Sequence, residues 1–372
     1  DIREVQRCTD CDVIKNLQIQ IIDDGSTDGT QDVIKKWGET NNIPVFVYDR
    51  PFDNFENCRN YAMQMVKDKA DYAFWLDADE TMEIDPNVFD KHKLDKDLYM
   101  FNTYIGAMKY TRNECWNTNK AFRWYGPVHE FIVCDEQGIS SGLMDGIVVK
   151  VQMDGGSWKG NIPDKYKKHS AILEDYIDNK DRNARWVFYT AQSYHDSASL
   201  PDNKEENDER LRRALKYYRE RTSRPDGYGE EIFYSQFRIG TIMRILEEPW
   251  ALTHQECLKA YNMDPIRGES IKTIIDYYLQ VNEWNMAYLY TKFAKVNFHG
   301  KNPYPNRLLF VDEALYIWKF AEAHAAACFY TGRMDEAKAT YQEIVNLSKT
   351  QPQYFTPEDF NKLQANAQFF NR

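Results

Sequence analysis

Three short apolar segments near the start of the chain end in acidic residues or lead directly into them, and this pattern constrains the fold more than any other feature. The segments are Leu17–Ile22, Ile43–Asp49 and Asp71–Glu80. Helical spacing of apolar residues fills the two intervals, at Asp28–Trp37 and Asn54–Ala70. Strands that alternate with helices predict a parallel, doubly wound sheet with its ligands beyond the carboxyl ends of the strands. Two acidic clusters lie at that end.

The next part of the chain has a different pattern. The segments "LYMFNTYIG" and "GIVVKVQ" are typical of strands, and an irregular, tryptophan-rich stretch from Arg112 to Glu136 separates them. We expect an antiparallel extension of the sheet here, with long loops that can carry function on a rigid scaffold.

From Asp164 onward the strand signal disappears and helical spacing replaces it. In Ala321–Val345, small residues fill a first helix, Gly332 makes a turn, and Ala337 and Tyr341 follow on a second helix. This segment resembles a tetratricopeptide repeat, a two-helix hairpin of ~34 residues. We expect about four degenerate repeats in an α-solenoid, with an ordinary helical bundle as the alternative. The predicted domains are therefore α/β at residues 1–160 and all-α at residues 161–372.

The two acidic clusters and the start of the second helix form three short sequence motifs whose order along the chain is informative. "IIDDGSTDGT" follows the first strand, "NFENCRNYAM" begins the second helix, and "FWLDADE" ends the third strand. Together they resemble the family 2 glycosyltransferases, which have the Rossmann-like GT-A fold with a mixed sheet. The resemblance covers roughly Arg3 to Gly155. In that family the first string is the nucleotide-recognition turn, and the last contains the D-x-D signature, here Asp77-Ala78-Asp79.

The resemblance implies a role for each residue of these strings. Asp24 and Ser26 would bind the nucleotide, and Asp24 would accept the N–H of a uracil base. Arg59 would contact the base or the diphosphate as a fixed cation. Asp79 would bind Mn²⁺ or Mg²⁺, and Asp77 the ribose or the water shell of the cation. These cations prefer oxygen ligands and act as Lewis acids on a departing diphosphate.

Each of these residues also has a purely structural interpretation. The acceptors after the first strand could form a turn and a helix N-cap, a role for which Asp28 or Thr27 is suited. Asp77 and Asp79 could lie in a solvated loop, although the apolar residues before them predict a buried strand that directs both to one place. Arg59 could be an ordinary surface arginine of a helix.

A third motif, "AFRWYGPVHEFI", follows the predicted sheet. In a subset of the family this stretch reads aromatic-x-Gly-x-x-His-Glu, and Tyr125–Glu130 fits that pattern. The resemblance implies that His129 binds the metal or the diphosphate and that Glu130 is the general base for an inverting transfer. A structural salt bridge is the alternative for Glu130. The tryptophans of this region, Trp116, Trp124 and Trp158, could stack on sugars or belong to the core.

The chain departs from the family pattern in two places. The family opens with a central strand, whereas "DIREVQRCTDC" at the start of this chain resembles the first helix instead. A missing central strand would expose unpaired backbone groups, so we expect residues upstream of Asp1 or another segment in that slot. The subset also often has a second histidine at or near the position of Met153. This chain therefore has no histidine there to take the role that the second histidine has in the subset.

Composition limits the partners and the compartment. The net charge of −11 argues against nucleic acid or an anionic membrane as the main partner. No segment approaches the ~18 apolar residues of a membrane span. Seven dispersed cysteines favour free thiols in the cytoplasm. Cys8 and Cys11 form a C-x-x-C that we interpret as one turn of a helix rather than a zinc or redox motif.

These observations predict a metal-dependent hexosyltransferase that moves a sugar, with inversion, from a nucleoside-diphosphate sugar to a hydroxyl group of a saccharide or protein. A UDP-sugar is the expected donor. The helical domain would position the acceptor or a protein partner, or would brace the enzyme or mediate self-association. One alternative is a repeat scaffold with an inactive transferase domain. A second is a sugar-nucleotide or nucleotidyl transferase, which would need a glycine-rich phosphate loop that the chain does not show after Asp1.

Overall fold

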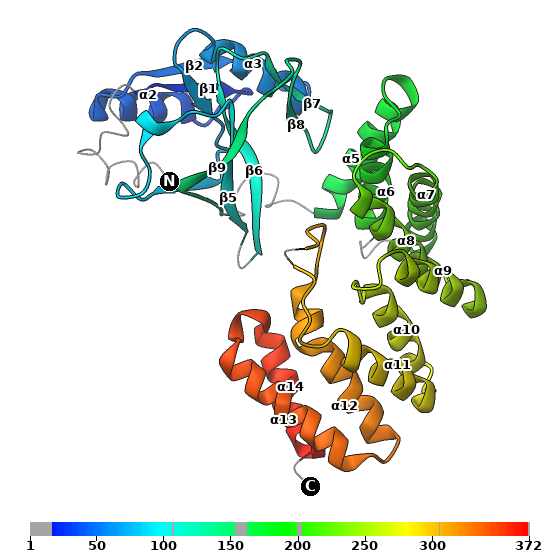
Figure 1. Cartoon of the computed structure of the whole chain (residues 1–372). Coiled ribbons are helices and arrows are strands. Elements are labelled where there is room, and N and C mark those ends of the chain that lie inside the picture. The colour runs from blue at the N-terminus through cyan, green and yellow to red at the C-terminus, as the bar shows by residue number, and fades with distance from the viewer. Residues whose placement is uncertain (1–16, 106–107, 153–161, 199–202, 305, 371–372) are drawn as a thin grey trace. The chain divides into compact units, whose positions relative to one another are not determined.

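The computed structural model describes residues 17–105, 108–152, 162–198, 203–304 and 306–370. It divides into two compact units, Asp1–Lys165 and Tyr166–Arg372 (Figure 1). The first unit contains β1 (Ile19–Asp23), α2 (Thr30–Asn41), β2 (Val45–Asp49), α3 (Phe55–Val66), β3 (Tyr72–Phe74), β4 (Glu80–Ile84), the 3₁₀ turn Lys91–Lys93, β5 (Leu98–Ile105), β6 (Met108–Asn117), β7 (Phe122–Tyr125), β8 (Phe131–Cys134) and β9 (Ser141–Val151).

Helices alone make up the rest of the described chain. They are α5 (Ile162–Asn179), α6 (Ala184–Ser197), α7 (Lys204–Thr222), α8 (Gly229–Ile245), α9 (Trp250–Met263), α10 (Glu269–Gln280), α11 (Trp284–Asn297), the π-helical turn Leu315–Lys319 that runs into α12 (Phe320–Tyr330), α13 (Met334–Thr350), the 3₁₀ turn Pro352–Tyr354 and α14 (Pro357–Phe370). The structure thus combines a mixed α/β part with an all-α part, as predicted.

The strands of the first unit form three sheets. β1 and β2 pair in parallel, β7 and β8 form an antiparallel hairpin, and the remaining five lie in the order β3-β6-β5-β9-β4. In the five-stranded sheet only β5 and β9 are parallel. The mixed sheet agrees with the expected GT-A class. Of the first three strands, β1 and β2 pair in parallel as predicted, whereas the three-residue β3 pairs antiparallel with β6, in the part of the chain where an antiparallel extension was expected.

No strand of the described residues lies in the slot expected for the central strand, between β1 and β3. Within the described residues, β1 pairs only with β2 and β3 only with β6, so the two are not joined directly. The expectation of an upstream or substitute strand stays a prediction. A second difference concerns Arg112–Glu136, which is not irregular: it contains the end of β6 and the β7–β8 hairpin.

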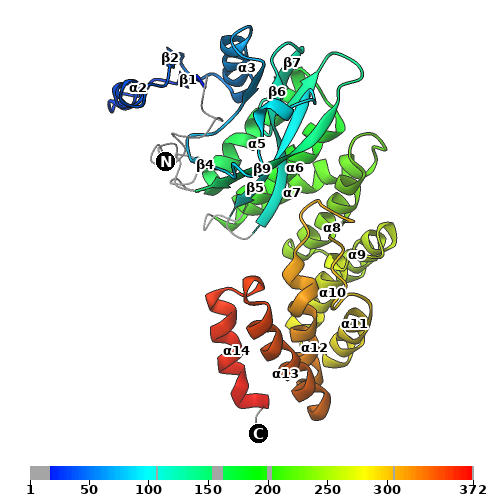
Figure 2. The same ribbon diagram turned by 60° about the vertical axis from the view of Figure 1, so that its left-hand side comes forward.

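Helix α3 connects these sheets and positions the candidate site. Asn54 caps it, since its side chain accepts the N–H of Asn57 at 2.8 Å. The helix contacts both β1 and β7 (Figure 2). Its buried Met63 packs into a core with Trp116 and Trp124 of β6 and β7. Burial of these large side chains fixes α3 against the β7–β8 hairpin.

In the second unit, helices that are consecutive in the chain pack against each other, α6 on α7, α7 on α8, α8 on α9, and α12 on α13. The hairpin predicted at Ala321–Val345 is confirmed as α12 and α13. Gly332 has a φ of 76° at the turn, a conformation that favours glycine. Ala321, Cys328 and Ala337 are fully buried where the two helices meet.

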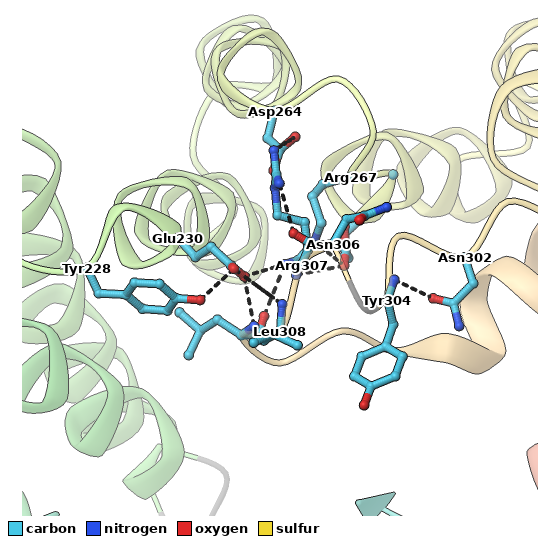
Figure 3. Close-up of polar contacts among 12 residues, drawn as sticks. Tyr228, Glu230, Asp264, Arg267, Asn302, Tyr304, Asn306, Arg307 and Leu308 are labelled. Carbon is cyan, nitrogen blue, oxygen red and sulfur yellow. Dashed lines mark hydrogen bonds and ion pairs between the residues drawn. The ribbon is translucent and has the colours of Figure 1, made fainter. Parts of the chain in front are cut away.

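A polar network fixes the long connection between α11 and α12 (Figure 3). Glu230, in the first turn of α8, accepts the backbone N–H groups of Leu308 and Leu309 at 3.0 and 2.8 Å. Arg307 pairs with Asp264 at 2.6 Å. Fully buried Arg267 donates to the carbonyl oxygen of Leu309 at 3.1 Å. These contacts satisfy backbone groups that a long loop would otherwise leave unpaired.

Two expectations from composition can be compared with the structure. The cysteines in the described residues, Cys58, Cys115, Cys134, Cys257 and Cys328, are all free thiols. Cys8 and Cys11 lie outside the described residues. In the part of the chain that the structure describes, none of the helices is both long and apolar enough to cross a bilayer.

Candidate functional site

The turn after β1 is organised by Asp23, a residue that sequence reasoning did not select. Its carboxylate accepts the backbone N–H and the hydroxyl of Ser26 at 3.2 and 2.6 Å, and it also accepts the side chain of Gln31. These hydrogen bonds from Ser26 and Gln31 lower the pKa of Asp23. The structure shows this role through the burial of Asp23 at the strand end, because a buried carboxylate needs hydrogen-bond donors nearby.

The predicted nucleotide residues of this turn lie around Asp23. Asp24 is exposed. The Ser26 hydroxyl is already a donor to Asp23, so only its lone pairs remain for a ligand. Gly29, not Asp28 or Thr27, occupies the N-cap position of α2. Asp28 still accepts the first-turn N–H of Thr30 at 3.0 Å, so its structural role is close to the expected one.

The D-x-D signature lies in a tight turn between β3 and β4. The Glu80 N–H donates to the Asp77 carbonyl at 3.0 Å, and the Asp77 N–H donates to the Glu80 carboxylate at 3.1 Å. The N–H of Gln152 donates to the Asp79 carbonyl at 2.8 Å. These hydrogen bonds hold the backbone at both aspartates in a fixed conformation. The solvated-loop interpretation therefore does not describe Asp77, which is half-buried and tied to its neighbours.

Arg59 joins two of the predicted motifs. Its guanidinium lies against the rings of Trp75 and Trp124, at 4.6 and 4.4 Å from their centroids, and the two rings contact each other edge to face. It pairs with Asp77 at 3.2 Å and with Glu130 at 2.8 Å. Only 13% of the Arg59 side chain is exposed. Arg59 is therefore not an ordinary surface residue, because a cation buried to this extent needs fixed partners.

A second set of contacts attaches the loop between β7 and β8 to α3. The side chain of Asn60 exchanges two hydrogen bonds of 2.8 Å with the backbone of Trp124. The Gly126 N–H donates to the Glu56 carboxylate at 3.1 Å. His129 has a φ of 56°, an uncommon conformation for a residue other than glycine. One helix thus places both the D-x-D turn and the His129-Glu130 pair.

The tryptophan predictions separate into two groups. Trp116 and Trp124 are each 4% exposed and belong to the core, so the sugar-stacking interpretation was wrong for both. Large aromatic rings of this kind supply most of the buried apolar area of a small core. Trp158 and Met153, where the second histidine of the family subset would stand, lie outside the described residues.

A buried charge network lies behind the D-x-D turn. Arg112 pairs with Glu80 at 2.6 Å and with Glu114 at 2.5 Å, and each carboxylate side chain is 2% exposed. Burial raises the pKa of Glu80. Burial also raises the pKa of Glu114 to about 8, although Arg112 and Arg59 oppose the shift. Sequence reasoning missed these residues; the two-residue spacing of Arg112 and Glu114 on one strand face was the available signal.

We expect Glu114→Gln to stabilise the protein increasingly as pH rises. Between the usual pKa of 4.5 and about 8, Glu114 stays protonated in the folded state but ionises on unfolding. The unfolded state then binds fewer protons, so stability falls with pH by up to ~1.4 kcal/mol per unit, and the loss is complete above the folded pKa. Glutamine does not ionise, so the variant lacks this pH-dependent loss of stability.

Urea denaturation at pH 5, 7 and 9 measures the effect. The exposed Glu83 of the edge strand β4, which pairs with Lys150 of β9, supplies the matched control Glu83→Gln. Stability curves of wild type and Glu114→Gln that stay parallel across this range would contradict the assignment of a neutral Glu114.

The donor groups at the turn fit a cation with few protein ligands. Both Asp77 oxygens lie 3.2–3.3 Å from Arg59, and Trp75 donates to one of them at 2.5 Å. Of the two carboxylates of the D-x-D turn, Asp77 is therefore the one occupied by Arg59 and Trp75, and Asp79 is the one that could hold a cation. The predicted pair of Asp79 and His129 does not belong to a group of three close ligand side chains within the described residues.

Comparisons with solved structures return helical proteins at low identity. The crystal structure of BtubC (BKLC) from P. vanneervenii is 12% identical, with a TM-score of 0.41, and the match covers 57% of this chain and 87% of that one. PilW, a widely conserved type IV pilus biogenesis factor, is 16% identical with a TM-score of 0.29 over 54% and 91%. Yeast Tom70 is 13% identical with a TM-score of 0.30 over 58% and 50%. No curated protein matches the chain.

The family comparison concerns the first unit. The model of the glycosyl transferase family 2 matches residues 5–129. This range contains Asp24, Arg59 and both aspartates of the D-x-D turn, and it ends immediately before Glu130. The strings that contain Asp24, Arg59 and Asp77–Asp79 lie inside the match, and the motif Ala121–Ile132 extends three residues beyond it. Residues 5–129 of this chain are therefore similar to the glycosyl transferase family 2.

Proposed function

We propose that this protein transfers a hexosyl group, with inversion, from a nucleoside-diphosphate sugar to a hydroxyl group of a saccharide or protein acceptor. A UDP-sugar is the expected donor. One observation supports this proposal most directly: Arg59 lies between Asp77 of the D-x-D turn and Glu130 of the β7–β8 loop. The three residues come from separate parts of the chain, so their convergence is not a consequence of local sequence.

The proposed chemistry assigns one task to each residue. The acceptor oxygen forms a bond to the anomeric carbon while the bond from that carbon to the diphosphate breaks, and the diphosphate keeps the electron pair. Glu130 accepts the proton of the acceptor hydroxyl. Arg59 stabilises the negative charge that develops on the diphosphate. Since Arg59 also pairs with Glu130, a shift of Arg59 toward phosphate would release this carboxylate for its role as a base.

Asp79 would hold the divalent cation through its half-exposed carboxylate, and His129 is the proposed second protein ligand. When bound, the cation would supply Lewis-acid stabilisation of the leaving diphosphate. Asp24 and Ser26, at the carboxyl end of β1, would bind the nucleotide. The helical unit would hold the acceptor or a partner protein, in keeping with the surfaces that stacked helical hairpins offer.

A thermal-shift screen of nucleotide-sugars tests this proposal, and Asp79→Asn is the informative variant. With wild type we expect Mn²⁺ and the right donor together to raise the unfolding temperature, because a ligand at 100 times its Kd adds about 2.7 kcal/mol of stability. Asp79→Asn is expected to abolish this shift, while Asp85→Asn, which changes an exposed carboxylate at the other end of β4, keeps it.

The alternative function, a repeat scaffold with an inactive transferase domain, makes the opposite prediction. No donor would then stabilise wild type, with or without Mn²⁺. Release of free sugar from the stabilising donor in the absence of acceptor would distinguish an active enzyme from a protein that only binds the nucleotide-sugar.

A further inference from the structure

A group of three metal-binding side chains lies in the helical unit, apart from the transferase residues. His324 and Cys328 occupy adjacent turns on one face of α12, and Glu336 lies in the first turn of α13. One ligand atom from each lies within 4.8 Å of the others, and within the described residues no other group of three or more His, Cys, Asp or Glu side chains meets this criterion. We propose that His324, Cys328 and Glu336 bind a borderline-soft divalent cation, with Zn²⁺ as the expected ion.

The distances between the ligand atoms suit a tetrahedral ion. His324 Nε2 lies 3.4 Å from Cys328 Sγ and 3.1 Å from Glu336 Oε1. Zinc binds nitrogen at about 2.0–2.1 Å, sulfur at about 2.3 Å and carboxylate oxygen at about 2.0–2.2 Å, so tetrahedral angles give about 3.5 Å between nitrogen and sulfur and about 3.3 Å between nitrogen and oxygen. These two distances differ from the tetrahedral values by only a few tenths of an ångström, and the third pair, Cys328 Sγ and a Glu336 oxygen, lies within 4.8 Å, against about 3.6 Å around a zinc ion.

The second nitrogen of His324 supports the same conclusion. Thr291 donates its hydroxyl hydrogen to the Tyr288 carbonyl at 3.1 Å, so its oxygen is free to accept Nδ1–H of His324, also at 3.1 Å. Thr291 thereby favours the tautomer in which Nε2 carries a lone pair, the form that binds a metal, whereas in the other tautomer Nε2–H donates to Glu336 at 3.1 Å. Metal-bound histidines usually donate their other N–H to such a partner.

The surroundings allow an ion to enter and to be neutralised. His324 and Cys328 are fully buried, whereas the Glu336 side chain is 30% exposed and opens the site to solvent. Lys292 binds the same Glu336 oxygen in the absence of an ion, but its side chain is 50% exposed and can move into water. On binding, the Cys328 thiol loses its proton to solvent, and the thiolate and carboxylate balance the charge of the ion. A fourth position remains for water.

Cobalt substitution provides a readout that does not depend on transferase activity. We expect one equivalent of Co²⁺ added to the full-length, reduced protein to produce a thiolate-to-cobalt charge-transfer absorption, which Zn²⁺ then displaces. Cys328→Ser is expected to abolish this absorption. Thr291→Val, which removes the acceptor for His324 Nδ1, is expected to weaken Zn²⁺ binding about 10–100-fold.

Three control variants separate this site from other places where Co²⁺ could bind. Cys257→Ser changes another fully buried thiol and is expected to keep the absorption. The double variant Cys8→Ser/Cys11→Ser tests the C-x-x-C pair, and Asp79→Asn tests the proposed transferase cation; both are expected to keep it. Wild type without the absorption, or an absorption that survives in Cys328→Ser, would overturn the proposal without bearing on the proposed transfer reaction.

Discussion

Replacing Glu130 with glutamine is expected to slow sugar transfer by ~10²–10⁴-fold, the usual contribution of a general base. Glutamine keeps the size of the side chain and places an amide near Arg59, so the ion pair at 2.8 Å is lost while the packing around it is preserved. What is lost is the ability to accept the proton of the acceptor hydroxyl. Donor binding should therefore stay close to that of wild type, and the loss should appear in kcat rather than in the KM for the donor.

Initial rates at saturating donor, together with the donor-induced thermal shift, measure both quantities. Glu136→Gln is the matched control, since Glu136 follows the same hairpin, is exposed and pairs with Lys120 at 3.2 Å. A Glu130→Gln variant that retains more than about a tenth of the wild-type rate falls short of the contribution of a general base and would assign Glu130 to the structural salt-bridge role.

Some of the fold follows directly from the sequence because local periodicity determines it. The α12–α13 hairpin is an example: small residues such as Ala321 and Ala337 are needed where two helices approach closely, and Gly332 supplies the positive φ of the turn. The two early helices and the strand β1 are also found within a few residues of the predicted bounds. These features depend on neighbours in the chain.

The strand partners could not be predicted in the same way. The residues of β3 fit a parallel strand as well as an antiparallel one, and only the position of β6 decides between them. The stretch that contains β7 and β8 has no regular apolar pattern in the sequence. Its Trp124 is buried against α3, and its hydrogen-bond partner Asn60 lies 64 residues earlier in the chain. Non-local pairing of this kind leaves little periodic signal in one sequence.

The candidate site shows the same division. The residue types Asp24, Asp77 and Asp79 follow from the motifs and their order, but the importance of Asp23 and Glu114 follows from burial. Arg59 was selected as a ligand-binding cation, and the structure adds the two tryptophan rings that contact its guanidinium. Neither ring could be assigned to this place from sequence, because tryptophans at strand ends more often serve only the core.

Arg59→Ala is expected to damage both stability and donor binding. Removal of this guanidinium leaves Asp77 and Glu130 facing each other across a space lined by Trp75 and Trp124, without the cation between them. Loss of one partner from a largely buried ion pair costs about 3 kcal/mol, and the cation–π contacts are lost as well. We expect urea denaturation to show this loss and the donor-induced thermal shift to disappear.

Two further variants distinguish the charge from its geometry. Arg59→Lys keeps the charge but cannot hold two carboxylates with one planar fork, so it should recover part of the stability and little of the donor binding. Arg123→Ala removes an exposed arginine that pairs with Asp135 and lies over Tyr125, and it should change stability by less than about 1 kcal/mol. Arg59→Ala could instead be as stable as Arg123→Ala and still bind donor. That result would contradict the proposed role of the guanidinium, because the D-x-D turn and Glu130 would then hold their positions without it.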